Sequence, residues 1–228
     1  KRFVIRLSSY RITKRRIKVN IPRSHLARFQ TIEYLRAFMA GRLGWAHLQS
    51  LLIISGAFGL FNKDRVVEVG GYLTSSERYK KDTVGEDMEL VVRLNRYMLE
   101  KKLPYSILYS FNANCWTEVP DTLPVLYRQR DRWQRGLIDI LYFHRTMQLN
   151  PRYGRIGLAV MPYFFLFELL GPFLEVQGYL MVVIAFFLGL IDTNLALLLF
   201  ISSILMGLLV SIFALAIAEK ENDYFPGP

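Results

Sequence analysis

The longest apolar run lies near the C-terminal end of the chain and limits what the chain can fold into. Residues 157–218 contain no Lys or Arg, and residues 195–217 are 23 consecutive positions without a charge. A helix needs roughly 20 apolar residues to cross a bilayer. We therefore predict transmembrane helices at about 172–191 and 195–217, joined by the hairpin Asp192-Thr193-Asn194. The segment at about 161–170 is too short to cross and is predicted to lie in the membrane interface.

Positive charge is concentrated in the other part of the chain. Residues 1–155 carry 28 of the 29 Lys and Arg residues and a net charge of +15, whereas residues 156–228 carry −5. Basic residues beside membrane helices favour the cytoplasmic side, where the leaflet is anionic. We therefore predict a multi-pass protein of the inner or plasma membrane whose basic domain is cytoplasmic and contacts membrane lipids. A phosphorylated substrate also explains the charge, while a nucleic acid ranks last because no recognition motif is present.

The basic part, residues 1–150, is predicted to be an α/β domain, followed by a membrane region over residues 151–228. Some segments alternate with the period of a strand and others repeat at helical spacing. Strands interleaved with helices indicate an α/β fold. Because the first residues already alternate as a strand, we expect the chain to begin within a domain and to lack its N-terminal half. The predicted strands lie in 1–22, 51–61 and 105–109, and the predicted helices at about 24–39, 86–98 and 122–145.

A polar motif, Gln129-Arg130-Asp131-Arg132-Trp133, lies on the last predicted helix. Positions 129, 132, 133 and 136 fall on one helix face, which combines an amide, a guanidinium, an indole and a glycine. Arginine can hold a diphosphate through charge-assisted hydrogen bonds, and tryptophan can stack on the apolar face of a sugar. The alternative is an interfacial helix whose arginines contact lipid phosphates.

A second motif, Gly85-Glu86-Asp87, stands at the start of the helix predicted over 86–98. A carboxylate held there can accept the proton of a hydroxyl nucleophile. The alternative is helix capping, because acidic residues are common in a first turn, where free N–H groups and the helix dipole favour them. Asp87 acts as a base only if a hydroxyl substrate lies beside it.

The order of these motifs resembles that of processive family 2 glycosyltransferases, such as cellulose, hyaluronan, chitin and poly-N-acetylglucosamine synthases. The resemblance rests on Ser55-Gly56-Ala57-Phe58-Gly59, Gly85-Glu86-Asp87, Cys115-Trp116-Thr117-Glu118-Val119-Pro120 and the QxxRW-type motif at 129–133, followed by membrane helices. Only the acid motif differs, with Gly85 where Thr is common. The chain is similar to the C-terminal part of such a protein.

The resemblance implies a GT-A fold, a nucleotide-sugar donor, expected to be a UDP-sugar, and a divalent cation, Mg²⁺ or Mn²⁺. It also implies inversion at the anomeric carbon and a polysaccharide or lipid-linked acceptor. A hydroxyl nucleophile needs a carboxylate base, and a departing diphosphate needs positive charge. The implied roles are: Asp87 as general base with Glu86 beside it; Gln129, Arg130 and Arg132 at the diphosphate; Trp133 at the acceptor sugar; and Ser55 and Gly56 in the acceptor pocket.

One departure limits this assignment. The family's donor-binding aspartate and metal-binding DxD motif are not found ahead of these motifs, because no acidic residue precedes Glu33. No residue of this chain is therefore assigned to a metal. Three hypotheses remain: a synthase that extends a polysaccharide and translocates it, a transferase that adds one sugar to a lipid carrier, and an inactive or partial subunit that serves as a membrane scaffold.

Other residues with chemical potential are scattered. His25, His47 and His144 are too far apart in sequence to suggest a metal site and are predicted to be surface or packing residues. Glu168 and Glu175, seven residues apart, share a helix face near the predicted membrane. Because acids are costly there, they suggest the wall of a sugar-polymer channel, with interfacial exposure or pairing with arginine as the alternatives.

Overall fold

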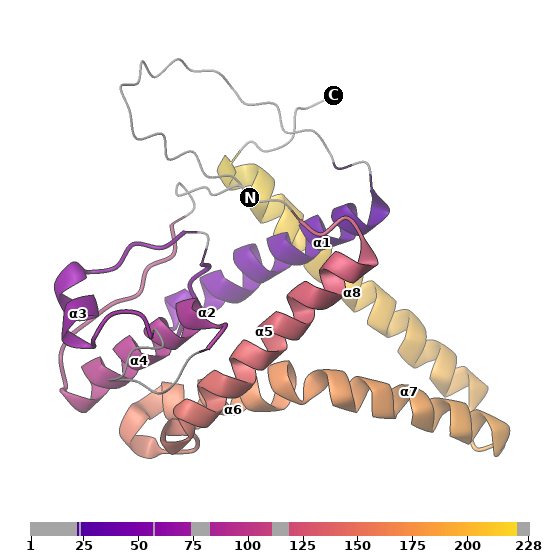
Figure 1. Cartoon of the computed structure of the whole chain (residues 1–228). Coiled ribbons are helices and arrows are strands. Elements are labelled where there is room, and N and C mark those ends of the chain that lie inside the picture. Colours follow the sequence, from indigo (N-terminus) through magenta and orange to yellow (C-terminus); the bar gives the residue numbers. More distant parts are fainter. Residues whose placement is uncertain (1–21, 23, 57, 74–82, 111–118, 223–228) are drawn as a thin grey trace, which may run out of the picture.

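The computed structural model, shown in Figure 1, describes residues 22, 24–56, 58–73, 83–110 and 119–222. Its basic part contains two long helices that pack against each other, α4 (Glu86–Glu100) and α5 (Leu123–Phe143). Both were predicted from helical spacing, and both predictions are confirmed. α4 begins after Gly85 with three acidic residues in its first turn, where the exposed N–H groups and the helix dipole favour negative charge.

A continuous helical run forms the other long element of the basic part. It consists of α1 (His25–Leu35), a π-helical stretch η1 (Arg36–Arg42) and α2 (Leu43–His47). The predicted helix at about 24–39 is confirmed, and it continues for eight residues beyond the predicted end. Residues 36–47 contain no proline, and the helix continues through Gly41 and Gly44 although glycine disfavours a helix interior.

Two segments that are neither helix nor strand, 51–55 and 103–110, occupy positions that were predicted as strands. The described residues form no strand, so the α/β prediction is not confirmed; the strands predicted in 1–22 lie outside the described residues. An extended segment becomes a strand only when a neighbouring backbone completes its hydrogen bonds. Here a side chain does so instead, since the Gln49 amide accepts from Ile107 N at 2.9 Å and donates to Ile107 O at 3.1 Å.

The main core lies between α4, α5 and a chain of short helices that follows α5. These are η2 (Arg145–Met147), η3 (Pro151–Tyr153), η4 (Ile156–Val160), α6 (Met161–Tyr163) and η5 (Phe164–Leu169). Met161 and Phe164 are buried in this core, whereas Phe167 is 66% exposed. The segment predicted to be interfacial therefore has one face against the basic part and one open face.

A short helix, α3 (Lys63–Glu68), was not predicted. Asn62 caps it, because its side-chain oxygen accepts from the backbone N–H groups of Asp64 and Arg65. Gly70 and Gly71 form a turn after α3, and both have positive φ values of 89° and 73°, which glycine adopts without steric cost.

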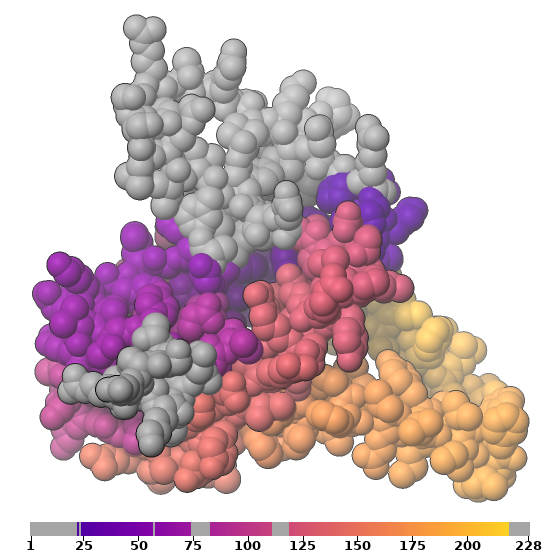
Figure 2. Space-filling model, viewed as in Figure 1, coloured from indigo at the N-terminus to yellow at the C-terminus, as the bar shows by residue number. Residues whose placement is uncertain are grey.

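Two apolar helices, α7 (Gly171–Phe187) and α8 (Thr193–Asn222), project from the rest of the molecule as a V-shaped pair (Figures 1 and 2). Among the described helices, the segment Thr193–Ala218 is long and apolar enough to cross a membrane. Ile156–Leu169 and Gly171–Phe187, which meet at a 46° bend, pass the same test only as a pair. The bend falls beside Pro172. Proline has no backbone N–H, so it cannot donate the helical hydrogen bond to the preceding turn.

The predicted connection between the two apolar helices is present. Asp192 caps α8, since its side chain accepts from Asn194 N at 2.9 Å and from Leu195 N at 3.0 Å. At its other end α8 packs against the first helical run, where Ala214 and Ala218 contact Met39. The small alanine side chains allow this close contact, which joins the apolar helix to the basic part.

Candidate functional site

The carboxylate of Asp87 is held at the first turn of α4 by two backbone groups. Its Oδ2 accepts from Gly56 N at 2.7 Å, and its Oδ1 accepts from Met88 N at 2.8 Å. A Cβ at Gly56 would lie 3.1 Å from Oδ2, so glycine allows this close approach. The structure thus brings together Asp87 and Gly56, two site residues predicted from separate motifs, and Ser55 directly precedes Gly56 in the chain.

A half-buried arginine, Arg42, lies in the electrostatic range of Asp87. Burial lowers the pKa of the Arg42 guanidinium, and the negative charge of Asp87 opposes this shift. The guanidinium stacks on the Phe38 ring, with 4.1 Å between its central carbon and the ring centroid. Sequence reasoning missed Arg42 because nothing in its local sequence distinguishes it from the other surface-type arginines of the helix.

The two motif helices touch through glycines. A Cβ at Gly136 on α5 would lie 2.9 Å from Gly85 Cα, and a Cβ at Gly85 would lie 3.1 Å from Gly136 Cα. Since any side chain at either position would meet backbone atoms, the glycine pair sets the spacing between α5 and the start of α4. This contact explains Gly85 in the acid motif: a Thr there would force the helices apart.

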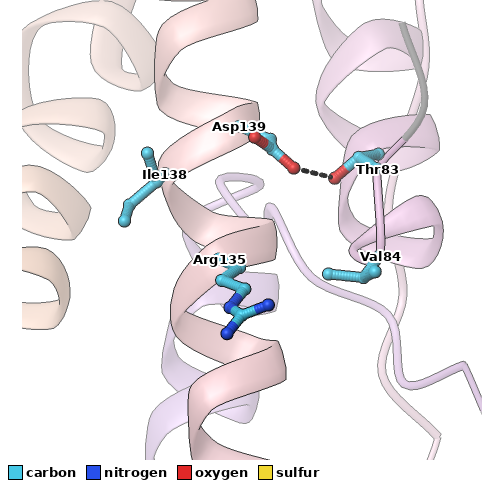
Figure 3. Close-up of a pocket in the computed structure, with 5 residues that line it drawn as sticks. All are labelled: Thr83, Val84, Arg135, Ile138 and Asp139. Atoms are coloured by element: carbon cyan, nitrogen blue, oxygen red, sulfur yellow. Dashed lines mark hydrogen bonds between the residues drawn. The ribbon is translucent and has the colours of Figure 1, made fainter.

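A shallow pocket lies next to this contact, lined by Thr83, Val84, Arg135, Ile138 and Asp139 (Figure 3). Thr83 donates a hydrogen bond to Asp139 Oδ2 at 3.0 Å and accepts one from Gly85 N at 3.2 Å. The same threonine therefore connects α5 to the backbone of the acid motif.

The QxxRW-type motif lies between the acid motif and α1. Tyr34 donates to Gln129 Oε1 at 3.3 Å, and its ring lies 6.3 Å from that of Trp133. Arg130 binds the Glu33 carboxylate at 2.6 Å. Arg132 is exposed and forms no ion pair with the described residues. Of the two arginines predicted to bind the diphosphate, Arg132 is therefore the one without a charge partner in the described part of the chain.

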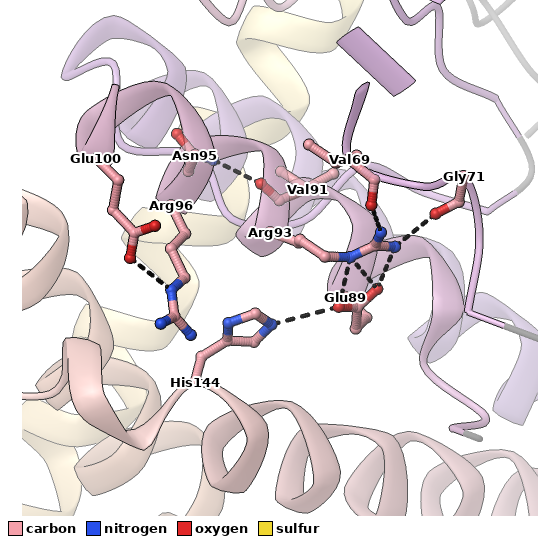
Figure 4. Close-up of polar contacts among 9 residues, drawn as sticks. All are labelled: Val69, Gly71, Glu89, Val91, Arg93, Asn95, Arg96, Glu100 and His144. Atoms are coloured by element: carbon pink, nitrogen blue, oxygen red, sulfur yellow. Dashed lines mark hydrogen bonds and ion pairs between the residues drawn. The ribbon is translucent and has the colours of Figure 1, made fainter. Parts of the chain in front are cut away.

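A buried polar cluster anchors α4 two residues beyond Asp87 (Figure 4). Glu89 is 1% exposed and pairs with Arg93 at 2.9 Å, while Arg93 also donates to the carbonyls of Val69 and Gly71. His144, at the end of α5, places Nε2 3.4 Å from Glu89 Oε1. Burial alone would raise the pKa of Glu89, but hydrogen bonds from His144 and Arg93 outweigh burial and hold the pKa below its usual range.

The family model described as glycosyl transferase family group 2 matches residues 16–218, which is most of the chain. The chain belongs to this family. The sequence-based prediction of a synthase-like family 2 glycosyltransferase is thereby confirmed.

Individual relatives of this glycosyltransferase match only its part around the motifs. A poly-beta-1,6-N-acetyl-D-glucosamine synthase of Staphylococcus aureus strain COL is 34% identical over 127 residues, and one of Staphylococcus epidermidis is 31% identical over 118 residues. These matches cover 55% and 52% of this chain but 28% and 26% of the relatives. The matched part thus spans little more than a quarter of their length. No solved structure gives a significant match.

The described residues of the glycosyltransferase do not fit a metal ion. They offer no group of three or more His, Cys, Asp or Glu side chains placed to hold one. Glu86 is exposed and adjacent to Asp87, but two acids alone do not complete a coordination sphere of oxygen ligands. We therefore assign the chemistry below to this chain's own residues and none of its steps to a cation.

Proposed function

We propose that the chain supplies the acceptor side of an inverting sugar transfer, in which Asp87 is the general base. The observation that carries this proposal is the Asp87 carboxylate, fixed by Gly56 N at 2.7 Å and set beside the motif helix by the Gly85–Gly136 contact. A base must be held within hydrogen-bond reach of the proton that it removes. Two backbone donors hold the carboxylate in place without neutralising its charge.

The reaction is a single in-line displacement. The acceptor hydroxyl oxygen attacks the anomeric carbon of the donor sugar, and its proton passes to the Asp87 carboxylate. The bond between the anomeric carbon and the diphosphate oxygen breaks, and the diphosphate leaves with the electron pair. The Arg132 guanidinium stabilises the negative charge that develops on this leaving group. Trp133, 43% exposed, offers an aromatic surface to the acceptor sugar.

The relatives suggest the substrates. Because two of them are named poly-beta-1,6-N-acetyl-D-glucosamine synthases, we propose UDP-N-acetylglucosamine as donor and a growing polymer as acceptor. Divalent cation dependence through Mg²⁺ or Mn²⁺ remains a prediction. The test is incorporation of labelled sugar by the full-length protein in membranes. A long product supports a processive synthase, a single addition supports transfer to a lipid carrier, and no transfer supports a scaffold subunit.

Replacing Trp133 by Ala is expected to reduce elongation by roughly two- to tenfold, the scale of losing one aromatic stacking contact in the transition state. Membrane association should not change. Tyr127→Ala is the matched control, since Tyr127 is an exposed aromatic residue of the same helix, outside the motif. Normal polymer synthesis by the Trp133 variant, with weaker membrane association, would support the interfacial interpretation instead.

Translocation through the membrane region and a cytoplasmic catalytic part are also proposed, on the basis of the charge asymmetry of +15 against −5. A cysteine introduced at Thr193, the first residue of α8, is expected to react with an impermeant reagent added outside the cell. A cysteine at Lys63, in the basic part, should react only after the membrane is opened. Reaction of the Thr193 site from the cytoplasmic side alone would contradict the predicted hairpin.

A further inference from the structure

One face of α1 lies against the QxxRW-type motif. Gln30, Glu33 and Tyr34 are three and four residues apart, so they share a face, and all three contact α5. Their partners on α5 are Gln129, Arg130 and Trp133. The motif therefore has, as its neighbour in space, a helix face that lies about 100 residues earlier in the sequence.

One end of the Arg130 guanidinium is held by this contact, and the Arg130 side chain is 39% exposed. Its Nη2 donates to Gln30 Oε1 at 2.9 Å and to the Glu33 carboxylate at 2.6 Å. Gln30 is 6% exposed and donates in turn to Glu33 at 3.0 Å, which closes a three-residue network. The Glu33 carboxylate thus offsets part of the positive charge of Arg130, so the net attraction of Arg130 for a diphosphate is weaker than that of Arg132, which has no ion pair with the described residues.

Trp133 contacts Arg130, a member of this network, and Tyr34, the neighbour of Glu33 on α1. The Arg130 guanidinium stands over the indole, with 4.7 Å between its central carbon and the ring centroid, within the range of a cation–π contact. Tyr34 approaches the indole from α1 with its ring planes tilted by 35°. Burial raises the pKa of Tyr34, so its hydroxyl stays protonated and can donate to Gln129.

We propose that Glu33 and Arg130 form a positioning pair that fixes the Trp133 indole, which makes α1 part of the acceptor site. Arg130 then acts through Trp133, and Arg132 alone of the two arginines binds the diphosphate. This inference rests on the proposed function for the identity of the acceptor sugar. The contacts that define the pair do not depend on it.

The first test uses Glu33→Ala, Arg130→Ala and the double variant in the full-length protein, with Arg132→Ala as control. Each single change is expected to slow elongation by roughly five- to tenfold, the scale of a partly exposed ion pair with its hydrogen bonds, with donor KM unchanged. The double variant should be no worse than either single variant, because both changes remove the same contact. Arg132→Ala should raise donor KM.

The proposal is overturned if Arg130→Ala raises donor KM as Arg132→Ala does, or if the effects of Glu33→Ala and Arg130→Ala add. A second measurement does not require activity: ¹⁹F NMR of fluorotryptophan-labelled protein, with the Trp133 signal assigned by its loss in Trp133→Phe. That signal should shift in Glu33→Ala and Arg130→Ala but not in Arg132→Ala. An unshifted signal in Glu33→Ala would exclude positioning. A shifted signal in a protein that transfers no sugar would refute the proposed function alone.

Discussion

Replacing Asp87 by Asn is expected to slow sugar transfer by roughly a hundred- to ten-thousandfold, the usual contribution of a general base. The change keeps the size of the side chain but removes its ability to take a proton. Nucleotide binding should be almost unaffected, because the groups proposed to contact the diphosphate lie on α5. The measurement is initial transfer rate together with nucleotide affinity, for the full-length protein with and without the change.

The geometry also predicts a structural cost for this variant. Asp87 accepts from two backbone N–H groups through its two oxygens, and an amide has only one oxygen to accept with. A loss of about 1 kcal/mol in the free energy of unfolding is therefore expected. Glu86→Gln is the matched control, since Glu86 is the exposed neighbour in the same turn. Near-normal transfer by Asp87→Asn would indicate that Asp87 only caps α4. A loss of nucleotide affinity as large as the loss of transfer rate would indicate the same.

Replacing Glu89 by Gln is expected to lower the free energy of unfolding by about 3 kcal/mol, because it leaves the Arg93 charge without its buried partner. Glu89 carboxylate is 2% exposed and accepts from Arg93 and His144. The measurement is thermal or denaturant unfolding of the full-length protein in detergent. Glu100→Gln is the matched control on the same helix: its pair with Arg96 is about one-third exposed, so a cost under about 1 kcal/mol is expected.

The same carboxylate makes stability depend on pH. The pKa of Glu89 is held below its usual value in the folded state, so its contribution is present above the unfolded pKa of about 4.5. The contribution is lost as the pH falls through the lowered folded pKa, where both states bind the proton. The stability difference between wild type and Glu89→Gln should therefore shrink on acidification below about pH 4.5. A constant difference down to pH 3 would show that the charge of Glu89 is not what stabilises the cluster.

The helices and the motif residues were predictable from the sequence, because both depend on local order. Helical spacing of apolar residues identified α4 and α5, and the order of the motifs identified the family, while the roles of Asp87 and Trp133 stay predictions. The strand predictions depended on partners, and an apolar run such as 51–61 does not show whether a neighbouring backbone will pair with it. In the described structure the side chain of Gln49, and not a neighbouring strand, forms the hydrogen bonds with the backbone of Ile107.

Tertiary structure decided which groups share a site and which are neutralised. His144, predicted to be a surface or packing residue, is buried against Glu89 from 55 positions away. Arg130, predicted beside Arg132 at the diphosphate, is paired with Glu33 from 97 positions away. Local spacing determines which side chains a helix presents on one face. Only the packing of α1 against α5, and of Gly85 against Gly136, determines which of those charges meet a partner, because electrostatic pairing depends on distance in space and not in sequence.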